Sequence, residues 1–417
     1  MFRFIHSADW QLGARFSQFG MRGPRLREAR IVTLRRALGL AREHGVDAFL
    51  IAGDLFEDNQ VDDALVSAVL ELFREHASVP IFILPGNHDP FTGPDSVWQR
   101  KAFLAAPANV RVLHEPGVID LGGALLLASP LQQKLSTIDP SLRFVAQAAS
   151  LPADAIKIGL THGALAIEAK HQPNDFPIAL NAASRAGLDY LAIGHWHNWL
   201  ADTDGGRVVM PGTPEPDRFA NDANGHVALV EIPGRGQPPH VKPLGVNTLT
   251  WRSLAFDFLS PEASRASLET ALTDLRRQAE RAVVRVTFTG TASPKSVAET
   301  RAWVESALAP FLVGQIVDRT RIALSTAELA DVQSRHPILA QTLADIDRLE
   351  SLATGETRSA LVAPSEVAGP GVTQPALSLA EIQALLSPSK IDLANLTPEF
   401  FSQLRQMLLQ TLQEVAP

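Results

Sequence analysis

The chain has 417 residues, no cysteine and a formal net charge of −8. That length exceeds the usual size of one hydrophobic core and predicts two or three domains, while 46% apolar and 20% charged residues are typical of globular proteins. Without cysteine, disulfides and thiolate metal sites are excluded, so His, Asp, Glu, Asn or Gln must hold any metal. The negative charge does not itself indicate nucleic-acid binding, which would need a local basic face.

The N-terminus reads MFRFIHSADW and has neither a long apolar core nor a cleavage-site pattern. No apolar run reaches the length of about 18 residues that a membrane span needs. Since the lack of cysteine also fits a reducing compartment, we expect a cytoplasmic protein.

The first half of the chain alternates short apolar strands with helical patterns. FRFIHSAD predicts a strand, residues 26–44 predict a helix with Gly45 as its C-cap, and DAFLIAGD predicts a buried strand. A helix over about 62–76 and the strand VPIFILPGNHD follow, and later strands are predicted in ALLLASP, AIKIGLTHG, YLAIGHWH, VVMPGTP and HVALVEI. Such alternation predicts an α/β layered domain, which we place at residues 1–248.

The remaining chain changes character. Residues 249–325 predict a small α+β module, and residues 326–352 form an amphipathic helical pattern. Residues 353–378 are rich in Gly, Pro, Ser and Ala and predict a flexible linker. Residues 379–417 predict C-terminal helices, with Thr397 as an N-cap and Pro398 at a first helical position.

Five polar loops, each placed directly after an apolar strand, carry residues suited to metal binding. They are SADWQLG with Asp9, IAGDLF with Asp54, LPGNHDP with Asn87, His88 and Asp89, LTHG with His162, and GHWH with His195 and His197. One such loop is more often a turn or a structural histidine. Together, at strand ends, they predict a site for two divalent ions, which needs a bridging carboxylate and further ligands on each side.

The order of these motifs resembles that of the calcineurin-like metallophosphoesterases. Within them, HSADWQLG, IAGDLFE and PGTPEP resemble the SbcD-type DNA repair exonucleases, and the resemblance is strongest for the YhaO-like branch in length and layout. It covers roughly residues 1–240 and, more loosely, the following module. It implies an α/β fold with a layered β-sandwich core flanked by helices, a small α+β capping domain and a helical C-terminal tail.

The resemblance also implies a role for each matching residue. Asp9 and His197 would bind the first metal, Asp54 would bridge both metals, and the second metal would be bound by Asn87, His162 and His195. Manganese is expected from the mixed nitrogen and oxygen ligands and from the resemblance, because magnesium is less suited to imidazole.

His88 matches the catalytic histidine of that family, which contacts the phosphate and assists the leaving oxygen. Asp89 follows it and is expected to orient the imidazole. The reaction implied is direct hydrolysis, with an activated water attacking phosphorus in line.

One position departs from the pattern, because Gln11 stands where the first motif usually has histidine. Its amide oxygen remains a possible ligand for a hard cation, although it binds a transition metal more weakly than imidazole does. Either the first site survives with altered affinity, which we favour, or it is weak and activity needs high metal.

An arginine-rich segment follows the first motif, and Arg15, Arg22 and Arg25 are our candidates for binding the DNA backbone. The alternative is a solvated helix face. Trp10 and Trp196 flank the metal loops and are candidates for stacking on a base, although packing within the loops is the favoured reading.

In the SbcD-type family, helices after the capping domain dock on an SMC-like coiled-coil ATPase (SbcC-like). The amphipathic stretches at 326–352 and 397–415 are candidates for that contact, with packing on this chain's own module or pairing as a homodimer as alternatives. The favoured function is thus a two-metal DNA exonuclease, with endonuclease activity left open. The rivals are a phosphodiesterase for small nucleotides and a non-catalytic scaffold with a weakened metal site.

Overall fold

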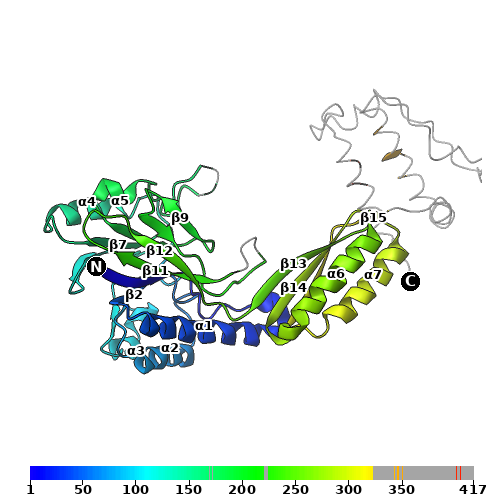
Figure 1. Ribbon diagram of the computed structural model, residues 1–417, viewed down its shortest axis with the longest axis horizontal. Helices are drawn as coiled ribbons and strands as arrows, with labels where there is room; N and C mark the ends of the chain where they lie inside the picture. Colours follow the sequence, from blue (N-terminus) through cyan, green and yellow to red (C-terminus); the bar gives the residue numbers. More distant parts are fainter. Residues whose placement is uncertain are drawn as a thin grey trace, which may run out of the picture. The chain divides into compact units, whose positions relative to one another are not determined.

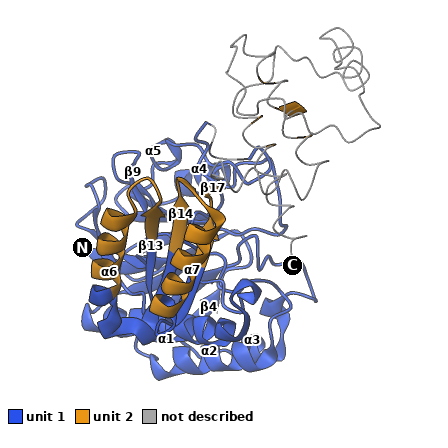
Figure 2. Cartoon of the chain, turned by 90° about the vertical axis from the view of Figure 1, so that its right-hand side faces the viewer, with its two compact units in different colours: residues 1–253, 273–285, 308–315 blue, residues 254–272, 286–307, 316–417 orange. Residues whose placement is uncertain are grey.

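The computed structural model describes residues 1–168, 170, 172–219 and 224–322, with isolated positions at 342, 345, 346, 350, 401 and 404. The chain divides into two compact units (Figure 2). Unit 1 comprises Met1–Ser253, Thr273–Arg285 and Leu308–Gln315, and unit 2 comprises Leu254–Leu272, Val286–Ala307 and Ile316–Pro417. Apart from those isolated positions, the predicted helical segment 326–352, linker 353–378 and helices 379–417 lie outside the described residues, and the predicted domain boundaries stay predictions.

Two six-stranded sheets form unit 1. The first has the order β12-β11-β1-β2-β3-β4 and is built from β1 (Phe2–Ser7), β2 (Ala48–Ala52), β3 (Ile81–Leu84), β4 (Val110–Val112), β11 (His226–Ile232) and β12 (His240–Gly245). The second has the order β5-β6-β7-β8-β10-β9 and is built from β5 (Gly117–Asp120), β6 (Leu125–Ser129), β7 (Lys157–His162), β8 (Tyr190–Gly194), β9 (Leu200–Thr203) and β10 (Val208–Met210).

The inner strands of both sheets are parallel. In the first sheet β1, β2, β3 and β4 run parallel, β11 pairs antiparallel with β1, and β12 pairs antiparallel with β11 at the edge. In the second sheet β6, β7, β8 and β10 run parallel, with β5 and β9 antiparallel at the edges. Parallel neighbours bring their carboxyl ends to one edge, where ligands gather in α/β sheets.

Successive residues of the buried strands face two different cores. In β2, Leu50 joins the core between the two sheets, whereas Phe49 and Ile51 join a core with helices. In β8, Tyr190 faces the sheet partner and Leu191 faces helices in the same alternating way. Strands buried on both faces read as continuous apolar runs, which is why LIA and YLAI lack polar positions.

Helices cover the outer face of each sheet and complete a four-layer α/β/β/α sandwich (Figure 1). The first sheet packs against α1 (Gly23–Glu43) and α2 (Asp63–Glu75), and the second against α4 (Leu142–Ala149) and α5 (Ala182–Ala186). The shorter elements are η1 (Ser17–Arg22), η2 (Val97–Gln99) and α3 (Lys101–Leu104). The predicted α/β layered core flanked by helices is confirmed.

A smaller α+β region follows in the chain. Its elements are β13 (Thr250–Asp257), α6 (Pro261–Leu275), η3 (Arg276–Arg281), β14 (Ala282–Thr289), β15 (Thr291–Ala292), α7 (Pro294–Leu308), β16 (Val313–Asp318) and β17 (Arg321–Ile322). Three of its strands form a sheet in the order β13-β14-β16, and β15 pairs with β17. Within the described part of the chain, no helix is long and apolar enough to cross a membrane.

Candidate metal centre

The loops that carry the predicted ligands begin where parallel strands end. Asp9 follows β1, Asp54 follows β2 and Asn87 follows β3, while His162 closes β7 and His195 follows β8. The carboxyl edges of both sheets thus contribute side chains to one place. The residues far apart in sequence meet because strand direction, and not local spacing, brings them together.

Backbone strain is concentrated at these loops. Asp9, Asp54 and His195 have positive φ values of 53°, 55° and 135°, and Gln11 has 40°. These four account for over half of the seven non-glycine residues with positive φ in the described chain. Such conformations cost about 1–3 kcal/mol each and persist where the surrounding structure imposes them, commonly at functional sites.

Two glycines permit the loops to approach one another. A Cβ on Gly53, whose φ is +89°, would lie 2.1 Å from Nδ1 of His162. A Cβ on Gly86 would lie 2.1 Å from Oδ1 of Asp54. The glycines of the GD and GNHD motifs are therefore required by close packing around the ligands, because any side chain there would displace them.

Three side chains form a compact triangle of donor atoms. Nε2 of His162 lies 2.8 Å from Oδ1 of Asn87, Nδ1 of His195 lies 3.0 Å from the same oxygen, and the two nitrogens are 3.3 Å apart. Oδ2 of Asp54 lies 3.3 Å from Nε2 of His162. Metal–ligand bonds of about 2.1 Å at right angles put neighbouring ligand atoms about 3.0 Å apart. The triangle matches one face of an octahedral ion site, and these are the residues predicted for the second metal.

The outer nitrogen of each of these imidazoles is already held by the protein. Nδ1 of His162 contacts the carbonyl oxygen of Ala52 at 2.8 Å. Nε2 of His195 contacts Oδ2 of Asp175 at 2.7 Å. The remaining nitrogens are therefore the ones directed to the centre, in the arrangement by which carboxylates and carbonyls orient metal-binding histidines. Asp175 was not predicted, since it lies in a loop without a recognisable motif.

Asp9 and Asp54 supply buried negative charge beside this triangle. Ligand atoms of Asp9, Asp54 and His162 all lie within 4.8 Å of one another, and none of the three residues is more than 1% exposed. Oδ2 of Asp9 accepts the main-chain N–H of His195 at 3.0 Å, but its Oδ1 is buried with no hydrogen-bond partner. A buried carboxylate oxygen without a donor is costly, and a divalent cation would satisfy it. The donor set thus fits a metal.

The buried charged groups of this cluster shift one another's pKa values. Burial raises the pKa of Asp9. Burial also works against charge on Asp54 and His162, yet their mutual attraction outweighs it. The pKa of Asp54 is therefore held below its ordinary value, and that of His162 rises to about 9. Without a metal, a proton on His162 balances the carboxylates, and a divalent ion would replace it.

His197, predicted for the first metal, is held from a different segment. Its Nδ1 lies 3.0 Å from Oδ2 of Asp217 and 3.0 Å from Nη2 of Arg218. Against the effect of burial, the hydrogen bond to His197 keeps the pKa of Asp217 below its usual range. Neither Asp217 nor Arg218 was predicted, although both lie in the PGTPEPDR segment whose start carried the resemblance.

Gln11 lies beside these residues. Its main-chain N–H donates to the carbonyl oxygen of Asp54 at 2.9 Å, and the residue lines one cleft with His88, His195 and His197. Gln11, His195 and His197 thus line one cleft, and the remaining predicted ligands are linked to His195 directly or through His162 by the contacts described above. Whether the Gln11 side chain binds metal stays a prediction.

His88 is fixed at the cleft by two loops. Its main-chain N–H donates to Oδ1 of Asp54 at 2.9 Å, and its Nδ1 contacts the carbonyl oxygen of Glu57 at 3.0 Å. This contact leaves Nε2 as the ring nitrogen available to a substrate. The geometry suits the role that the resemblance implied for His88.

The expectation for Asp89 is wrong. Its carboxylate does not orient His88 but accepts the main-chain N–H groups of Phe56 and Gly86 at 2.9 and 2.8 Å. The residue is fully buried, and burial together with the charge of Asp54 raises its pKa to about 7. Asp89 therefore ties the second and third motif loops together, and the carbonyl of Glu57 takes the orienting role.

The cleft has a volume of about 940 Å³ and includes Trp196 among its lining residues. Trp10, the other tryptophan considered for base stacking, is fully buried and donates from Nε1 to Oγ of Ser7 at 3.0 Å. It packs in the core beneath the loop and cannot meet a base. Trp196 is partly buried and packs against a hydrophobic cluster, as the favoured reading expected, yet it also lines the cleft.

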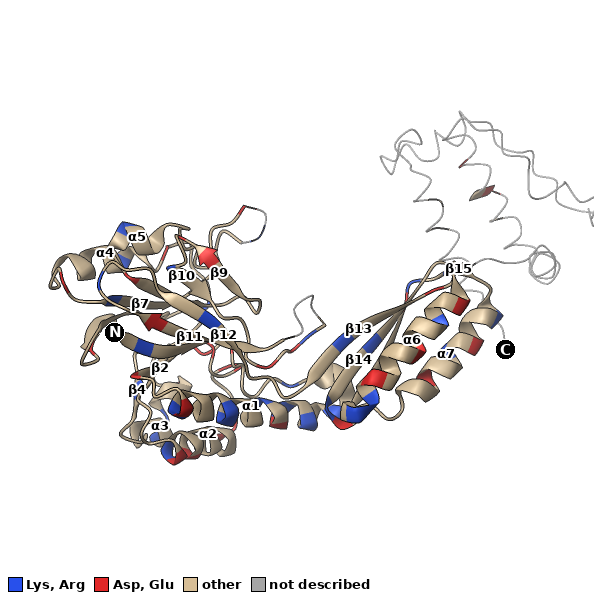
Figure 3. Ribbon diagram, in the orientation of Figure 1, with Lys and Arg blue, Asp and Glu red and all other residues tan. Residues whose placement is uncertain are grey.

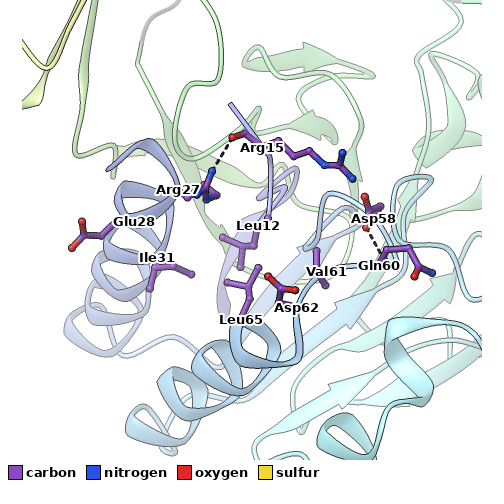
Figure 4. Close-up of a pocket in the computed structure, with 11 residues that line it drawn as sticks. Leu12, Arg15, Arg27, Glu28, Ile31, Asp58, Gln60, Val61, Asp62 and Leu65 are labelled. Carbon is purple, nitrogen blue, oxygen red and sulfur yellow. Dashed lines mark hydrogen bonds between the residues drawn. The ribbon is translucent and has the colours of Figure 1, made fainter. Parts of the chain in front are cut away.

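The candidate DNA-binding arginines do not line this cleft. Arg15, Arg22 and Arg25 are exposed at and before α1, along which basic residues recur (Figure 3). Arg15 lines a separate cavity of about 450 Å³ together with Arg27 and the acidic Asp58 (Figure 4). Their role in DNA binding stays a prediction.

Arg30, counted with the same basic segment, is instead 1% exposed. Its Nη1 donates to the carbonyl oxygen of Trp10 at 2.5 Å, and its guanidinium lies 5.3 Å from the ring centroid of Phe16. Arg30 therefore supports the first motif loop from beneath and belongs to no surface for DNA.

Comparison with known proteins agrees with this geometry. Residues 2–199 match the family model described as Calcineurin-like phosphoesterase. The Bacillus subtilis (strain 168) protein named "Uncharacterized metallophosphoesterase YhaO" is 23% identical over 321 residues, which cover 69% of this chain and 72% of that protein. Residues 2–199 are thus similar to the calcineurin-like phosphoesterases, and both comparisons support a metal-dependent hydrolase, as the motifs predicted.

Proposed function

We propose that the chain binds two divalent ions, best matched by manganese, and hydrolyses phosphodiester bonds in DNA as an exonuclease. The observation that carries the proposal is the triangle of His162, His195 and Asn87 beside Asp54 and the unpartnered oxygen of Asp9. Imidazole, amide and carboxylate donors together favour manganese over magnesium. The cleft beside them is open to a substrate.

When bound, the ions would supply an activated water and positive charge at the phosphate oxygens. The chain's own residues then position the reacting groups. The carbonyl of Glu57 fixes the ring of His88, which when protonated donates from Nε2 to the departing oxygen of the phosphodiester. Asp54 holds both the main chain of His88 and the ring of His162, so the proton donor and the metal ligands share one support.

Three features support DNA as the substrate. HSADWQLG and PGTPEP resemble the SbcD-type nucleases, and a small α+β region follows the phosphoesterase domain. Exposed Arg15, Arg22 and Arg25 follow the first motif. Two further basic side chains, Lys170 and Arg218, are exposed and line the cleft itself, where they would meet phosphates flanking the scissile bond.

Digestion of end-labelled linear DNA with manganese tests the proposal. We expect metal-dependent shortening by the wild-type protein that both His88→Ala and Asp54→Ala abolish. Turnover of a small phosphodiester without any DNA degradation would contradict it and favour a small-nucleotide phosphodiesterase. The intact fixation of His88 argues against a non-catalytic scaffold.

We also propose an SMC-like coiled-coil ATPase as partner, on the amphipathic patterns at 326–352 and 397–415. Coexpression with a separate ATPase of this type should give a complex that survives purification. A complex that forms equally well after deletion of residues 326–417 would contradict this site of contact, and self-association of the free chain would favour a homodimer.

A further inference from the structure

Two indole rings line the cleft immediately beside the metal-ligand loops. Trp196 separates His195 from His197, and Trp199 follows two residues later. Both side chains are half-buried, and both line the cleft together with His88. Consecutive Cα atoms are about 3.8 Å apart, so this short separation in sequence keeps both indoles near His195 and His197.

These indoles differ from the other tryptophans of the chain. Trp10, Trp98 and Trp251 are at most 4% exposed and belong to cores. Trp196 and Trp199 each pack against a core cluster and are only partly buried, and the ring centroid of Trp199 lies 6.0 Å from that of His226. Trp303 lies on α7, and the guanidinium carbon of Arg265 is 4.3 Å from the centroid of the Trp303 ring. Of the six tryptophans, all within the described chain, only Trp196 and Trp199 line the cleft.

The rest of the lining is mixed. Ile167 and Leu200 add apolar surface, and Lys170 and Arg218 add positive charge. The acidic Glu57, Asp175 and Asp217 line the cleft as well, and Asp217 pairs with Arg218. A flat apolar group joined to phosphates would use the apolar and basic side chains of this lining, and a nucleotide is such a group. The cleft volume of about 940 Å³ lies within the range of sites for small organic ligands.

Base pairing decides whether a nucleobase can stack on the two indole rings. Inside a duplex both faces of a base are covered by its neighbours, so an aromatic side chain can reach only an unpaired or extruded base. Stacking on aromatic rings is tolerant of base identity because every base has a π face. An indole next to the reacting phosphate therefore selects for an unpaired nucleotide and not for a sequence.

We propose that Trp196 and Trp199 form a nucleobase-stacking subsite, which makes the cleft specific for an unpaired nucleotide whose phosphate reaches the metal ligands. The inference rests on the proposed function, because it takes the unpaired nucleotide to be part of a DNA strand. The same chemistry is also present in a free nucleotide ester, so the two sources are separated by experiment.

The test compares Trp196→Ala, Trp199→Ala and their phenylalanine counterparts with Trp303→Ala, a matched control on α7. Four substrates are used with manganese: a single-stranded oligonucleotide, the same strand in a blunt duplex, the strand with abasic residues at both ends, and the 4-nitrophenyl ester of thymidine 5′-phosphate. Methyl 4-nitrophenyl phosphate serves as a diester without a base. KM and kcat are measured separately for each.

We expect the alanine variants to raise KM for the single strand about 5- to 150-fold, as loss of base stacking does, with a smaller change in kcat. Phenylalanine should restore most of the loss, and Trp303→Ala should match wild type. The abasic strand and the base-free diester should be insensitive to all variants. The blunt duplex should be the poorer substrate, and an equal loss on the thymidine ester would assign the subsite to free nucleotides as well.

Equal KM values for wild type and both alanine variants on the single strand and the thymidine ester would overturn the subsite. So would the same loss on the base-free diester, which would indicate a damaged cleft. If wild type degrades no DNA, the proposed function fails, yet the thymidine ester still tests the indoles independently.

Discussion

The two predicted metal-ligand sets differ in how completely the folded chain holds them. In the second set, donor atoms of His162, His195 and Asn87 lie 2.8–3.3 Å apart, and His162 is fully buried. In the first set, Asp9 offers one unpartnered buried oxygen, Gln11 supplies a neutral amide, and His197, whose side chain is 14% exposed like that of His195, contacts Asp217 and Arg218. The second set is preorganised by close contacts among its donor atoms, and the first has a weaker donor in Gln11.

This difference shows what strand ends can and cannot provide. Loops after β2, β3, β7 and β8 interlock, because the Ala52 carbonyl fixes His162 and the glycines permit close contact. His197 is instead fixed by Asp217, from a segment beyond the parallel strands. We therefore expect the second metal to bind more tightly and the first to be the adjustable one.

Removing the shared carboxylate should have the largest effect. Asp54→Asn takes away the charge that is predicted to bridge the two metals and the ion-pair partner of buried His162. Because metal-assisted stabilisation is worth several kcal/mol, we expect activity to fall by about three orders of magnitude. Phosphodiesterase rates and metal content by atomic absorption check this, with circular dichroism as a folding control. Retained activity with both metals bound would contradict a bridging role.

Removing His88 should separate catalysis from metal binding. His88→Ala deletes the ring that Glu57 positions but none of the predicted ligands, so we expect a rate loss of about 10²- to 10⁴-fold. Manganese affinity measured by calorimetry should be unchanged. A parallel loss of bound metal would show that His88 is a ligand, and the two ligand sets would then have to be reassigned.

The carboxylates behind the histidines allow a direct comparison of the two sets. Asp175→Asn loosens His195, and Asp217→Asn loosens His197. Each substitution should lower the affinity for one metal by about 10- to 100-fold. Asp175→Asn should affect the tighter binding event, and Asp217→Asn the weaker one. Calorimetric titration with manganese distinguishes them. If both variants affect the same binding event, the assignment of two sets is wrong.

The pKa of His162 predicts how metal binding depends on pH. In the metal-free protein this pKa is raised to about 9, so the ring is protonated at neutral pH and a metal must displace the proton. Below pH 9, apparent affinity of the second site should fall as pH falls, by up to about tenfold per unit. Calorimetry in buffers of different ionisation enthalpy should detect the released proton. No proton release at pH 7 would contradict the raised pKa.

The substitution at position 11 should have the smallest effect. Gln11→His replaces an amide by imidazole in the first set, and we expect the manganese requirement of activity to fall about tenfold. The second binding event should not change. An unaltered metal dependence would show that Gln11 is not a ligand.

The sequence identified side chains that the fold brings close together, because their chemistry and their position after apolar strands are both visible in it. Asp9, Asp54, Asn87, His162 and His195 meet in one cluster, and His197 lines the adjoining cleft. Their roles as metal ligands stay predictions. The partners behind them were missed. Asp175 and Asp217 act through hydrogen bonds to residues 20 positions away, and no local pattern records such a contact.

The error at Asp89 has a physical origin. Adjacency to His88 suggested that Asp89 orients it, but neighbouring side chains in a turn point in different directions, and Asp89 turns inward to two main-chain N–H groups. The local sequence around Asp89 does not record that direction, which comes from the folded chain.

The most direct test of this asymmetry is calorimetric titration of the metal-free protein with manganese. We predict two binding events of unequal affinity, the tighter one lost in His162→Ala and the weaker one lost in His197→Ala. A single class of equivalent sites, or a tight event that survives His162→Ala, would contradict the account.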